Sequence, residues 1–177
     1  MVSSLDGFIA KKDNSMDWFE TSGHYEKGVA YTGDEIKAFL QTIDCYVMGA
    51  ATYRHAAELS KNYGWPYGDV PTFVLSHKSL QATRPQIRIL SGELTQIVKE
   101  QLQPAYKNIW VVGGAKLVRD FIRLQLAAEI RLSVLPVILG EGLALFDDMK
   151  EQALNLKEVT AYKTGMVELQ YQLKPQG

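Results

Sequence analysis

The sequence has little cysteine, no excess of charge of one sign and no long apolar run. Its one cysteine, Cys45, excludes an internal disulfide framework and a cysteine-rich zinc site. The balance of 19 basic against 20 acidic residues argues against nonspecific nucleic-acid binding, which requires a basic excess. No apolar run approaches the roughly 18 residues of a membrane span. Residues 1–7 also lack the charged and apolar regions of a signal peptide. We therefore expect a cytoplasmic protein with no nucleic-acid or membrane partner.

The composition is that of an ordinary globular protein, with 46% apolar and 22% charged residues in a chain of 177. A chain of this length buries roughly 70% of the surface that its unfolded form exposes, so it can fold without a disulfide or a metal. The sequence contains no internal repeat, low-complexity tract or linker. We therefore predict a single domain over residues 1–177.

Short runs of β-branched and aromatic residues, bounded by turn formers, predict buried strands. These runs lie at residues 45–48, 72–75, 87–90 and 109–112, with a longer run at 130–139 that Pro136 interrupts. The segments 156–162 and 166–173 flank a turn and predict an antiparallel hairpin at the C-terminus. The chain therefore contains enough strand signal for a substantial sheet with an antiparallel edge.

Helical patterns alternate with these strands. The apolar residues at 36, 39, 40 and 43 have the spacing of one face of a helix, and residues 93–102 and 115–126 show similar patterns. Strands that alternate with helices indicate an α/β fold with a largely parallel sheet, which favours ligand binding at the carboxyl ends of the strands.

The strongest local signal is a strand that leads into two glycines, Gly113 and Gly114, and then into a helix. The first N–H groups of a helix lack intrahelical partners and carry partial positive charge, so they bind phosphate. A plain tight turn without a ligand explains the same residues equally well. The pattern is neither the GxGxxG dinucleotide motif nor a P-loop.

Two other strand ends repeat this arrangement. Gly49 and Thr52 follow the strand at 45–48, where Thr52 could instead only cap the helix. Ser76, His77 and Lys78 follow the strand at 72–75 and bring hydroxyl, imidazole and ammonium groups together. Because each of these three strand ends can bind an anion, together they predict one extended ligand with several phosphates.

Other chemistries find little support in the sequence. The three histidines lack the spacing of metal ligands, so no metal site is predicted, and no GxSxG motif is present. Cys45 lies in an apolar strand pattern typical of core packing. Asp34 begins a helical segment, where a carboxylate also simply favours the helix dipole.

The ordered motifs resemble those of a known superfamily. SLDGFIA at residues 4–10, VMGAATY at 47–53, IWVVGGAKL at 109–117 and PVILGEG at 136–142 fall in the order of the dihydrofolate reductase superfamily. They are most similar to the reductase domain of the bifunctional riboflavin-biosynthesis deaminase-reductase and its stand-alone relatives. The resemblance implies an α/β, dihydrofolate reductase-like three-layer fold. Its central sheet is mixed but mainly parallel, with flanking helices and an antiparallel C-terminal hairpin.

The resemblance also implies an NADPH-dependent reductase that transfers hydride to a small heterocycle. The substrate would be a pteridine, as in dihydrofolate reductase, or an aminopyrimidine, as in 5-amino-6-(5-phosphoribosylamino)uracil reductase. Ala50 stands where dihydrofolate reductases usually have a basic residue, so a preference for NADPH over NADH would rest on His77, Lys78 or Arg54. The implied cofactor-binding residues are Gly49, Thr52, Leu75, Ser76, His77, Gly113, Gly114, Ala115, Lys116 and Leu117.

On the substrate side the resemblance points to four residues. Asp34 matches the buried acid that binds the pterin, although a simple helix-start role stays open. Trp18 is similar to the tryptophan of the active-site loop, and Ser133 to a hydroxyl residue on the sheet. Asp6 could contact substrate or only form a turn with Gly7.

Two further hypotheses stay open beside the reductase. The chain could be a catalytically weak nucleotide- or pterin-binding sensor on the same fold, or a stable domain with turn glycines and no ligand.

The C-terminal hairpin provides a sheet edge that must be covered. The riboflavin-type relatives use this region in dimers, so we predict a C2 homodimer.

Overall fold

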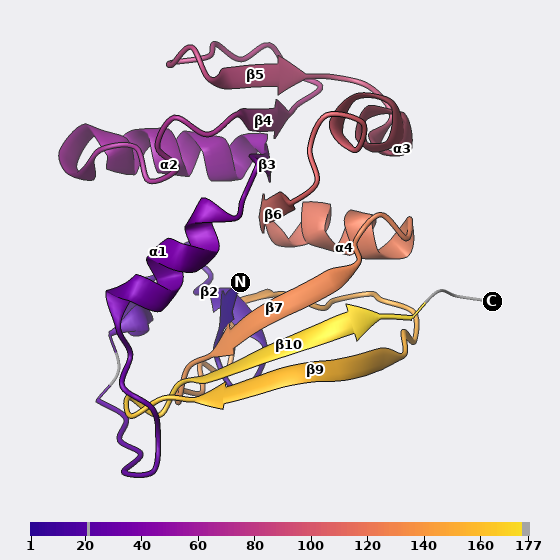
Figure 1. Ribbon diagram of the computed structural model, residues 1–177. Helices are drawn as coiled ribbons and strands as arrows, with labels where there is room; N and C mark the ends of the chain where they lie inside the picture. Colours follow the sequence, from indigo (N-terminus) through magenta and orange to yellow (C-terminus); the bar gives the residue numbers. More distant parts are fainter. Residues whose placement is uncertain (21, 175–177) are drawn as a thin grey trace. The chain divides into compact units, whose positions relative to one another are not determined.

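The computed structural model describes residues 1–20 and 22–174, which divide into two compact units. Unit 1 consists of Met1–Thr32 and Arg119–Gly177, and unit 2 of Gly33–Val118. Figure 1 shows the elements of both. No helix within the described residues has both the length and the apolar character that crossing a bilayer requires. The single domain over residues 1–177 stays a prediction.

Unit 2 contains the parallel sheet that the sequence predicts. Its strand order is β5-β4-β3-β6, and every neighbouring pair is parallel. The interior of β3 is fully buried, as expected for a central strand. The four strands are β3 (Cys45–Gly49), β4 (Thr72–Leu75), β5 (Ile87–Leu90) and β6 (Ile109–Gly113).

The helices that start in unit 2 are α1 (Gly33–Gln41), α2 (Ala50–Tyr63), α3 (Leu94–Gln96) and α4 (Ala115–Arg123). The helix expected at 93–102 is only partly α-helical, because α3 continues as the π-helical turn η2 (Ile97–Leu102). The helix expected at 115–126 ends at Arg123, and Gln125 beyond it takes a left-handed conformation with φ of 53°.

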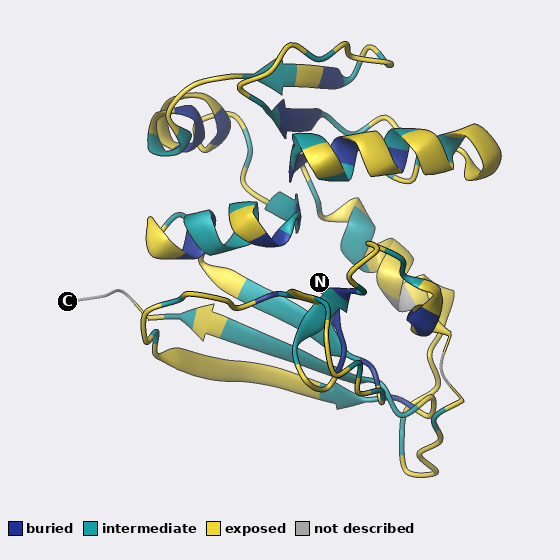
Figure 2. Cartoon of the chain, turned by 180° about the vertical axis from the view of Figure 1, so that it is seen from behind, coloured by how far each residue is buried: buried dark blue, intermediate teal, exposed yellow. Residues whose placement is uncertain are grey.

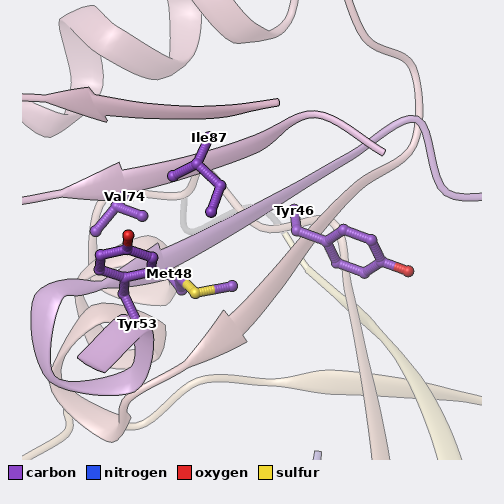
Figure 3. Packing of buried hydrophobic residues seen from close by; sticks show 5 residues of the cluster. All are labelled: Tyr46, Met48, Tyr53, Val74 and Ile87. Carbon is purple, nitrogen blue, oxygen red and sulfur yellow. The ribbon is translucent and has the colours of Figure 1, made fainter. Parts of the chain in front are cut away.

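The core of unit 2 joins the sheet to α2. Tyr46, Met48 and Val74 come from β3 and β4 and belong to one core cluster with Tyr53 of α2. Figure 3 shows Tyr53 beside Met48 and Val74. The Tyr53 hydroxyl donates a hydrogen bond to the Gln81 carbonyl at 2.9 Å and accepts one from the Thr83 N–H at 3.0 Å. This buried tyrosine therefore holds the segment after β4 against α2.

Unit 1 contains a second four-stranded sheet, with strand order β1-β7-β10-β9. The short strand β1 (Val2–Ser3) pairs in parallel with β7 (Glu129–Val134). The hairpin of β9 (Leu154–Ala161) and β10 (Val167–Leu173) confirms the predicted antiparallel C-terminus. The strand expected over 130–139 ends at Val134, two residues before Pro136, which has no N–H to donate.

The smaller elements of unit 1 lie near its N-terminal segment. β2 (Phe8–Ala10) pairs with β8 (Leu143–Ala144), and the 3₁₀ turn η1 spans Asp17–Phe19. The α/β class, the parallel sheet, the flanking helices and the antiparallel C-terminal strands are confirmed. Within the described residues the strands form one four-stranded sheet in each unit and the two-stranded pair of β2 and β8.

Candidate functional site

The two strands of unit 2 that end in glycine lie side by side. β3 and β6 are neighbours, and Met48 lies opposite Gly113 in the register. A Cβ added to Gly49 would lie 4.0 Å from the Gly113 carbonyl oxygen, and one added to Gly114 would lie 3.6 Å from Thr52 Oγ1. The first turns of α2 and α4 therefore begin side by side, at a place where the backbone carries no side chains.

Thr52 has two predicted roles, contact with an anion and capping of α2, and the geometry at the start of α2 distinguishes them. The residue before the helix is Gly49, and no side chain caps the helix there. Thr52 lies inside the first turn, so it is not the N-cap residue. Because the first N–H groups of a helix find no partner within the helix, both helix starts have backbone donors available to an anion.

At the start of α4 the buried residues Gly113 and Ala115 are followed by the exposed Lys116 and the half-buried Leu117. The Gly114 carbonyl already accepts a hydrogen bond from the Val118 N–H at 3.1 Å, so α4 is regular from its first turn. The four predicted residues Gly114, Ala115, Lys116 and Leu117 thus form one continuous turn next to Gly49.

The third predicted strand end adjoins the first. Leu75 at the end of β4 lies opposite Gly49 in the register. The Ser76 hydroxyl is occupied by its own turn, because it donates to the Lys78 carbonyl at 2.9 Å and accepts from the Lys78 N–H at 3.1 Å. His77 and Lys78 are exposed. The three strand ends therefore lie at one edge of the sheet, while ligand binding by them stays a prediction.

Asp34, the predicted catalytic acid, is not buried. It is the second residue of α1, its side chain is 91% exposed, and its carboxylate lies 4.0 Å from Lys37 Nζ. The resemblance implies a buried carboxylate at this point, so the expected burial is wrong. The geometry is that of the alternative helix-start role.

Asp6 in unit 1 holds a loop. Its carboxylate accepts hydrogen bonds from Ser4 Oγ at 2.6 Å, from the Gly140 N–H at 2.7 Å and from the Leu139 N–H at 3.1 Å. The Ser4 hydroxyl, followed by the two backbone N–H groups, holds the pKa of Asp6 below its usual value against an opposing effect of burial. Asp6 therefore does more than form a turn with Gly7, and its three donors tie the PVILGEG segment to the SLDGFIA segment.

Trp18 is buried in unit 1, where it packs edge-to-face on Phe19 with ring centroids 4.7 Å apart. Its indole N–H is also buried and has no hydrogen-bond partner within the described residues. A buried donor without a partner is costly, and native structures usually supply a water or a ligand for it. Trp18 thus offers one unused donor.

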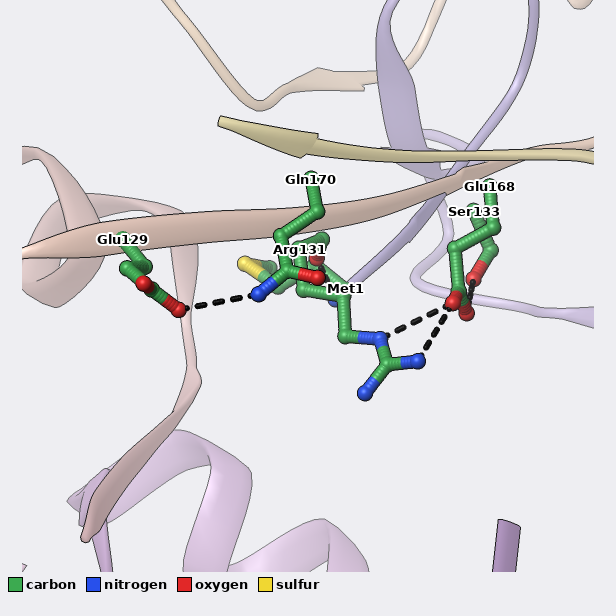
Figure 4. A network of polar contacts seen from close by, with 6 residues as sticks. All are labelled: Met1, Glu129, Arg131, Ser133, Glu168 and Gln170. Atoms are coloured by element: carbon green, nitrogen blue, oxygen red, sulfur yellow. Dashed lines mark hydrogen bonds and ion pairs between the residues drawn. The ribbon is translucent and has the colours of Figure 1, made fainter. Parts of the chain in front are cut away.

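Ser133 belongs to a polar cluster that the sequence reasoning did not find. Arg131 on β7 donates through Nε and Nη2 to Glu168 Oε1 at 2.9 and 2.7 Å, and Ser133 Oγ lies 3.5 Å from Glu168 Oε2 (Figure 4). Glu168 on β10 lies directly opposite Ser133. Its side chain is 20% exposed, so unit 1 holds a carboxylate far more buried than Asp34.

A signal for this cluster existed in the sequence. Arg131 and Ser133 are two residues apart and so lie on one face of β7, and Glu168 and Gln170 do the same on β10. Figure 4 also shows Gln170 bonded to Glu129 farther along the same strands, at 3.0 Å. Only the register of the two strands, 35 residues apart, identifies the partners.

Cys45 is confirmed as a core residue. It is fully buried in β3, and burial, together with the charge of Asp44, raises the pKa of its thiol to about 12. A thiol in this state is neither a nucleophile nor a metal ligand at neutral pH.

Comparison with known proteins places the chain in a family. Residues 1–168 match the model of the RibD C-terminal domain family. YwjB, an uncharacterized protein of Bacillus subtilis, is 33% identical over 156 residues, which cover 87% of this chain and 84% of YwjB. YyaP of the same organism, also uncharacterized, is 31% identical over 182 residues, with 97% and 91% covered.

Solved structures show the same fold. A Shewanella sp. PV-4 protein provisionally assigned to riboflavin biosynthesis superimposes with a TM-score of 0.82 at 25% identity, covering 99% of this chain and 97% of that one. A Thermotoga maritima diaminohydroxyphosphoribosylaminopyrimidine deaminase/5-amino-6-(5-phosphoribosylamino)uracil reductase gives a TM-score of 0.68 at 13% identity. The match covers 98% of this chain and 55% of the Thermotoga chain, so this likeness concerns the fold alone.

Proposed function

Since the chain belongs to the RibD C-terminal domain family, we propose that it is a reductase that transfers hydride from NADPH to a pteridine or aminopyrimidine-type heterocycle. The observation that carries the proposal is the adjacency of Gly49 and Gly113 at the starts of α2 and α4 in unit 2. The nicotinamide supplies the hydride chemistry, and the protein binds and orients the cofactor.

The starts of α2 and α4 suit a dinucleotide pyrophosphate. Each helix N-terminus carries roughly half a positive charge, and backbone N–H groups bind phosphate without any need for excess lysine and arginine. Gly49 and Gly114 leave the space that a close approach of phosphate requires. Lys116 in the first turn of α4 adds a cation. These features support cofactor binding by unit 2.

The substrate side of the proposal rests on unit 1. A pteridine or aminopyrimidine has ring N–H and amino donors beside carbonyl acceptors. Glu168 is an acceptor of the kind that such donors need, and Arg131 fixes its orientation through two hydrogen bonds. Ser133 and the unused indole N–H of Trp18 supply further polar groups. We therefore propose Glu168 as a second candidate for the substrate-binding carboxylate, in addition to Asp34.

The experiment is a direct assay of the full chain. NADPH and NADH are first titrated by fluorescence, and oxidation is then followed with dihydrofolate and with 5-amino-6-(5-phosphoribosylamino)uracil. Hydride transfer to either heterocycle supports the proposal. If neither dinucleotide binds at submillimolar concentration, the reductase function is wrong.

A second function is a binding module that holds a nucleotide or pterin without turnover. The exposure of Asp34 favours it, because a 91% exposed carboxylate has no desolvated environment in which to assist protonation. Tight dinucleotide and pterin binding without oxidation in the same assay would select this function.

We also propose a homodimer. The edge strand β9 leaves Leu156 and Val159 exposed, and an unpaired edge with apolar side chains is a typical pairing surface. Light scattering of the full chain tests this assembly, and a monomeric mass at micromolar concentration would contradict it.

A further inference from the structure

Unit 1 contains three arrangements of a kind that binds anions, and each of them already holds a carboxylate of the chain itself. They are an arginine fork on β7, a pair of backbone N–H groups in the PVILGEG segment and two lysines that follow β2. The same parts of unit 1 carry the predicted substrate residues Asp6, Trp18 and Ser133. The state of these three arrangements therefore bears on the charge that a substrate can carry.

The arginine fork belongs to Arg131. Two of its N–H groups are directed at one oxygen, Glu168 Oε1, as described above. The pair is partly shielded from water, with 37% of the Arg131 side chain and 20% of the Glu168 side chain exposed. An anion that displaced Glu168 would leave its carboxylate charged, half-buried and without its partner, which is costly. Arg131 is therefore a poor receptor for an anionic group of the substrate.

The two backbone N–H groups belong to Leu139 and Gly140. Successive N–H groups that point to one place form an anion-binding concavity in many proteins. Here they donate to the Asp6 carboxylate, at 3.1 Å from the Leu139 nitrogen and 2.7 Å from the Gly140 nitrogen. The Ser4 hydroxyl, followed by these N–H groups, holds the pKa of Asp6 below its usual value, so the carboxylate is ionised at neutral pH. The loop already contains its anion.

The two lysines after β2 are each paired with an acid. Lys11 Nζ lies 2.9 Å from the Asp17 carboxylate, and Lys12 donates to Glu141 in the PVILGEG segment. The hydrogen bond from Lys11 holds the pKa of Asp17 below its usual value, so this carboxylate is also ionised at neutral pH. Both pairs are exposed and each contributes little to stability. Their net charge is nevertheless zero, so neither lysine gives an approaching anion a net attraction.

A phosphate or carboxylate tail on the substrate would have to lie beside the carboxylates that occupy these groups. Like charges placed side by side repel, and binding sites reject wrong partners in this way. The ring donors and acceptors of an uncharged heterocycle meet no such repulsion. On the basis of the proposed function, we infer that the substrate of this chain is an uncharged, amino-substituted heterocycle without an anionic tail.

Two compounds have this chemistry. Dihydropterin is the reacting ring of dihydrofolate without its glutamate tail, and 5-amino-6-(ribosylamino)uracil is the aminopyrimidine without its phosphate. Each compound therefore forms a pair with an anionic counterpart that has the same reacting ring. Comparison within each pair measures the effect of the tail, and comparison between the pairs identifies the ring.

The test measures kcat/KM of the full chain with NADPH for the four compounds. We expect each uncharged compound to exceed its anionic counterpart by about tenfold or more at low ionic strength. Because the repulsion is electrostatic, this ratio should shrink as the ionic strength rises from about 0.01 M to about 0.15 M, which shortens the screening length from about 30 Å to about 8 Å. Equal or better use of the anionic compounds at low ionic strength would overturn the inference. It would assign the tail to another cation of unit 1, with the exposed Lys27 and Lys163 as candidates.

Two variants release a lysine from its acid. Glu141→Gln removes the partner of Lys12, and Asp17→Asn removes that of Lys11. Each should raise kcat/KM for the phosphorylated aminopyrimidine about threefold and leave that of its uncharged counterpart within about twofold. Glu58→Gln is the matched control, because Glu58 forms a similarly exposed pair with Lys61 in unit 2, and it should leave the ratio unchanged. A ratio that also stays unchanged in both unit 1 variants would overturn the inference.

Binding measurements separate a failure of this inference from a failure of the proposed function. The four compounds are also titrated by tryptophan fluorescence without a dinucleotide, and thermal melting confirms that each variant is folded. If no compound is oxidised but the uncharged ones bind about tenfold more tightly, the reductase function is wrong and the charge preference stands. If the anionic compounds are oxidised as well as the uncharged ones, the reductase function stands and the inference is wrong. If none of the four binds, both are wrong.

Discussion

The two units present polar groups in different ways. In unit 2 the strands are parallel and their interiors are buried, so the groups open to a ligand are backbone amides and side chains at the strand ends. In unit 1 the antiparallel pair β7–β10 displays Arg131, Ser133 and Glu168 across one face. Figure 2 shows the contrast in burial, with β4 mostly dark blue and β9 mostly yellow.

This difference suits two kinds of ligand. Helix N-termini and glycines bind phosphate through backbone N–H groups. Such binding depends little on the structure of the rest of the ligand. A fixed carboxylate and hydroxyl on a sheet face select a pattern of donors and acceptors, which is specific to one heterocycle. This difference predicts that cofactor affinity depends on the free space beside the glycine backbone in unit 2. Substrate affinity should instead depend on the polar side chains of unit 1.

The largest effect is expected from Gly114→Leu in unit 2. The Cβ of Gly114→Ala would lie 3.6 Å from Thr52 Oγ1, an ordinary contact, whereas the longer leucine side chain would fill the space proposed for phosphate. We expect the leucine variant to bind NADPH at least about 100-fold more weakly by fluorescence titration, and the alanine variant about tenfold at most. Undiminished affinity in the leucine variant would contradict the backbone site.

The next effect concerns the edge of unit 1. Val159 on β9 is exposed, and Val159→Lys places a charge on a strand edge that we propose is paired in a dimer. We expect light scattering to show a shift from dimer to monomer. Lys157→Arg on the same strand keeps the charge and should leave the dimer intact. A dimer that persists in Val159→Lys would place the interface elsewhere.

A smaller effect should separate the two carboxylates. Glu168→Gln keeps the shape of the side chain but removes the charge that Arg131 and a ring N–H would contact. We expect KM for the heterocycle to rise about tenfold, and a stability loss of about 1 kcal/mol because the pair is partly exposed. Asp34→Asn should change KM by less than about twofold, since its side chain is 91% exposed. The reverse outcome would assign the acid to unit 2.

The smallest effect is a pH dependence that arises from Asp6. Its folded pKa is held below the unfolded value, chiefly by the Ser4 hydroxyl, so its stabilising effect is complete above the unfolded pKa of about 3.9 and is lost as pH falls through the folded pKa. Melting curves between pH 6 and about pH 2 should show a shallower loss of stability for Asp6→Asn than for the unmodified chain. Parallel curves would show that the carboxylate does not hold the 139–140 loop in solution.

Much of the fold could be predicted because its signals are local. A strand of four or five apolar residues that meets glycine and then a helical pattern is readable within ten residues, as at Gly49 and Gly113. The C-terminal hairpin is readable for the same reason. The π-helical turn η2 was not, because its pattern at 97–102 also fits an ordinary helix.

The candidate site likewise has a part that local sequence predicts and a part that it does not. The sequence alone determined that three strand ends at Gly49, Leu75 and Gly113 could serve one ligand, because parallel strands that precede helices end at the same edge of a sheet. Only the tertiary structure decided that Asp34 is exposed and that Glu168 faces Ser133. Burial and cross-strand register depend on residues 30 or more positions away, and neither local propensity nor spacing records them.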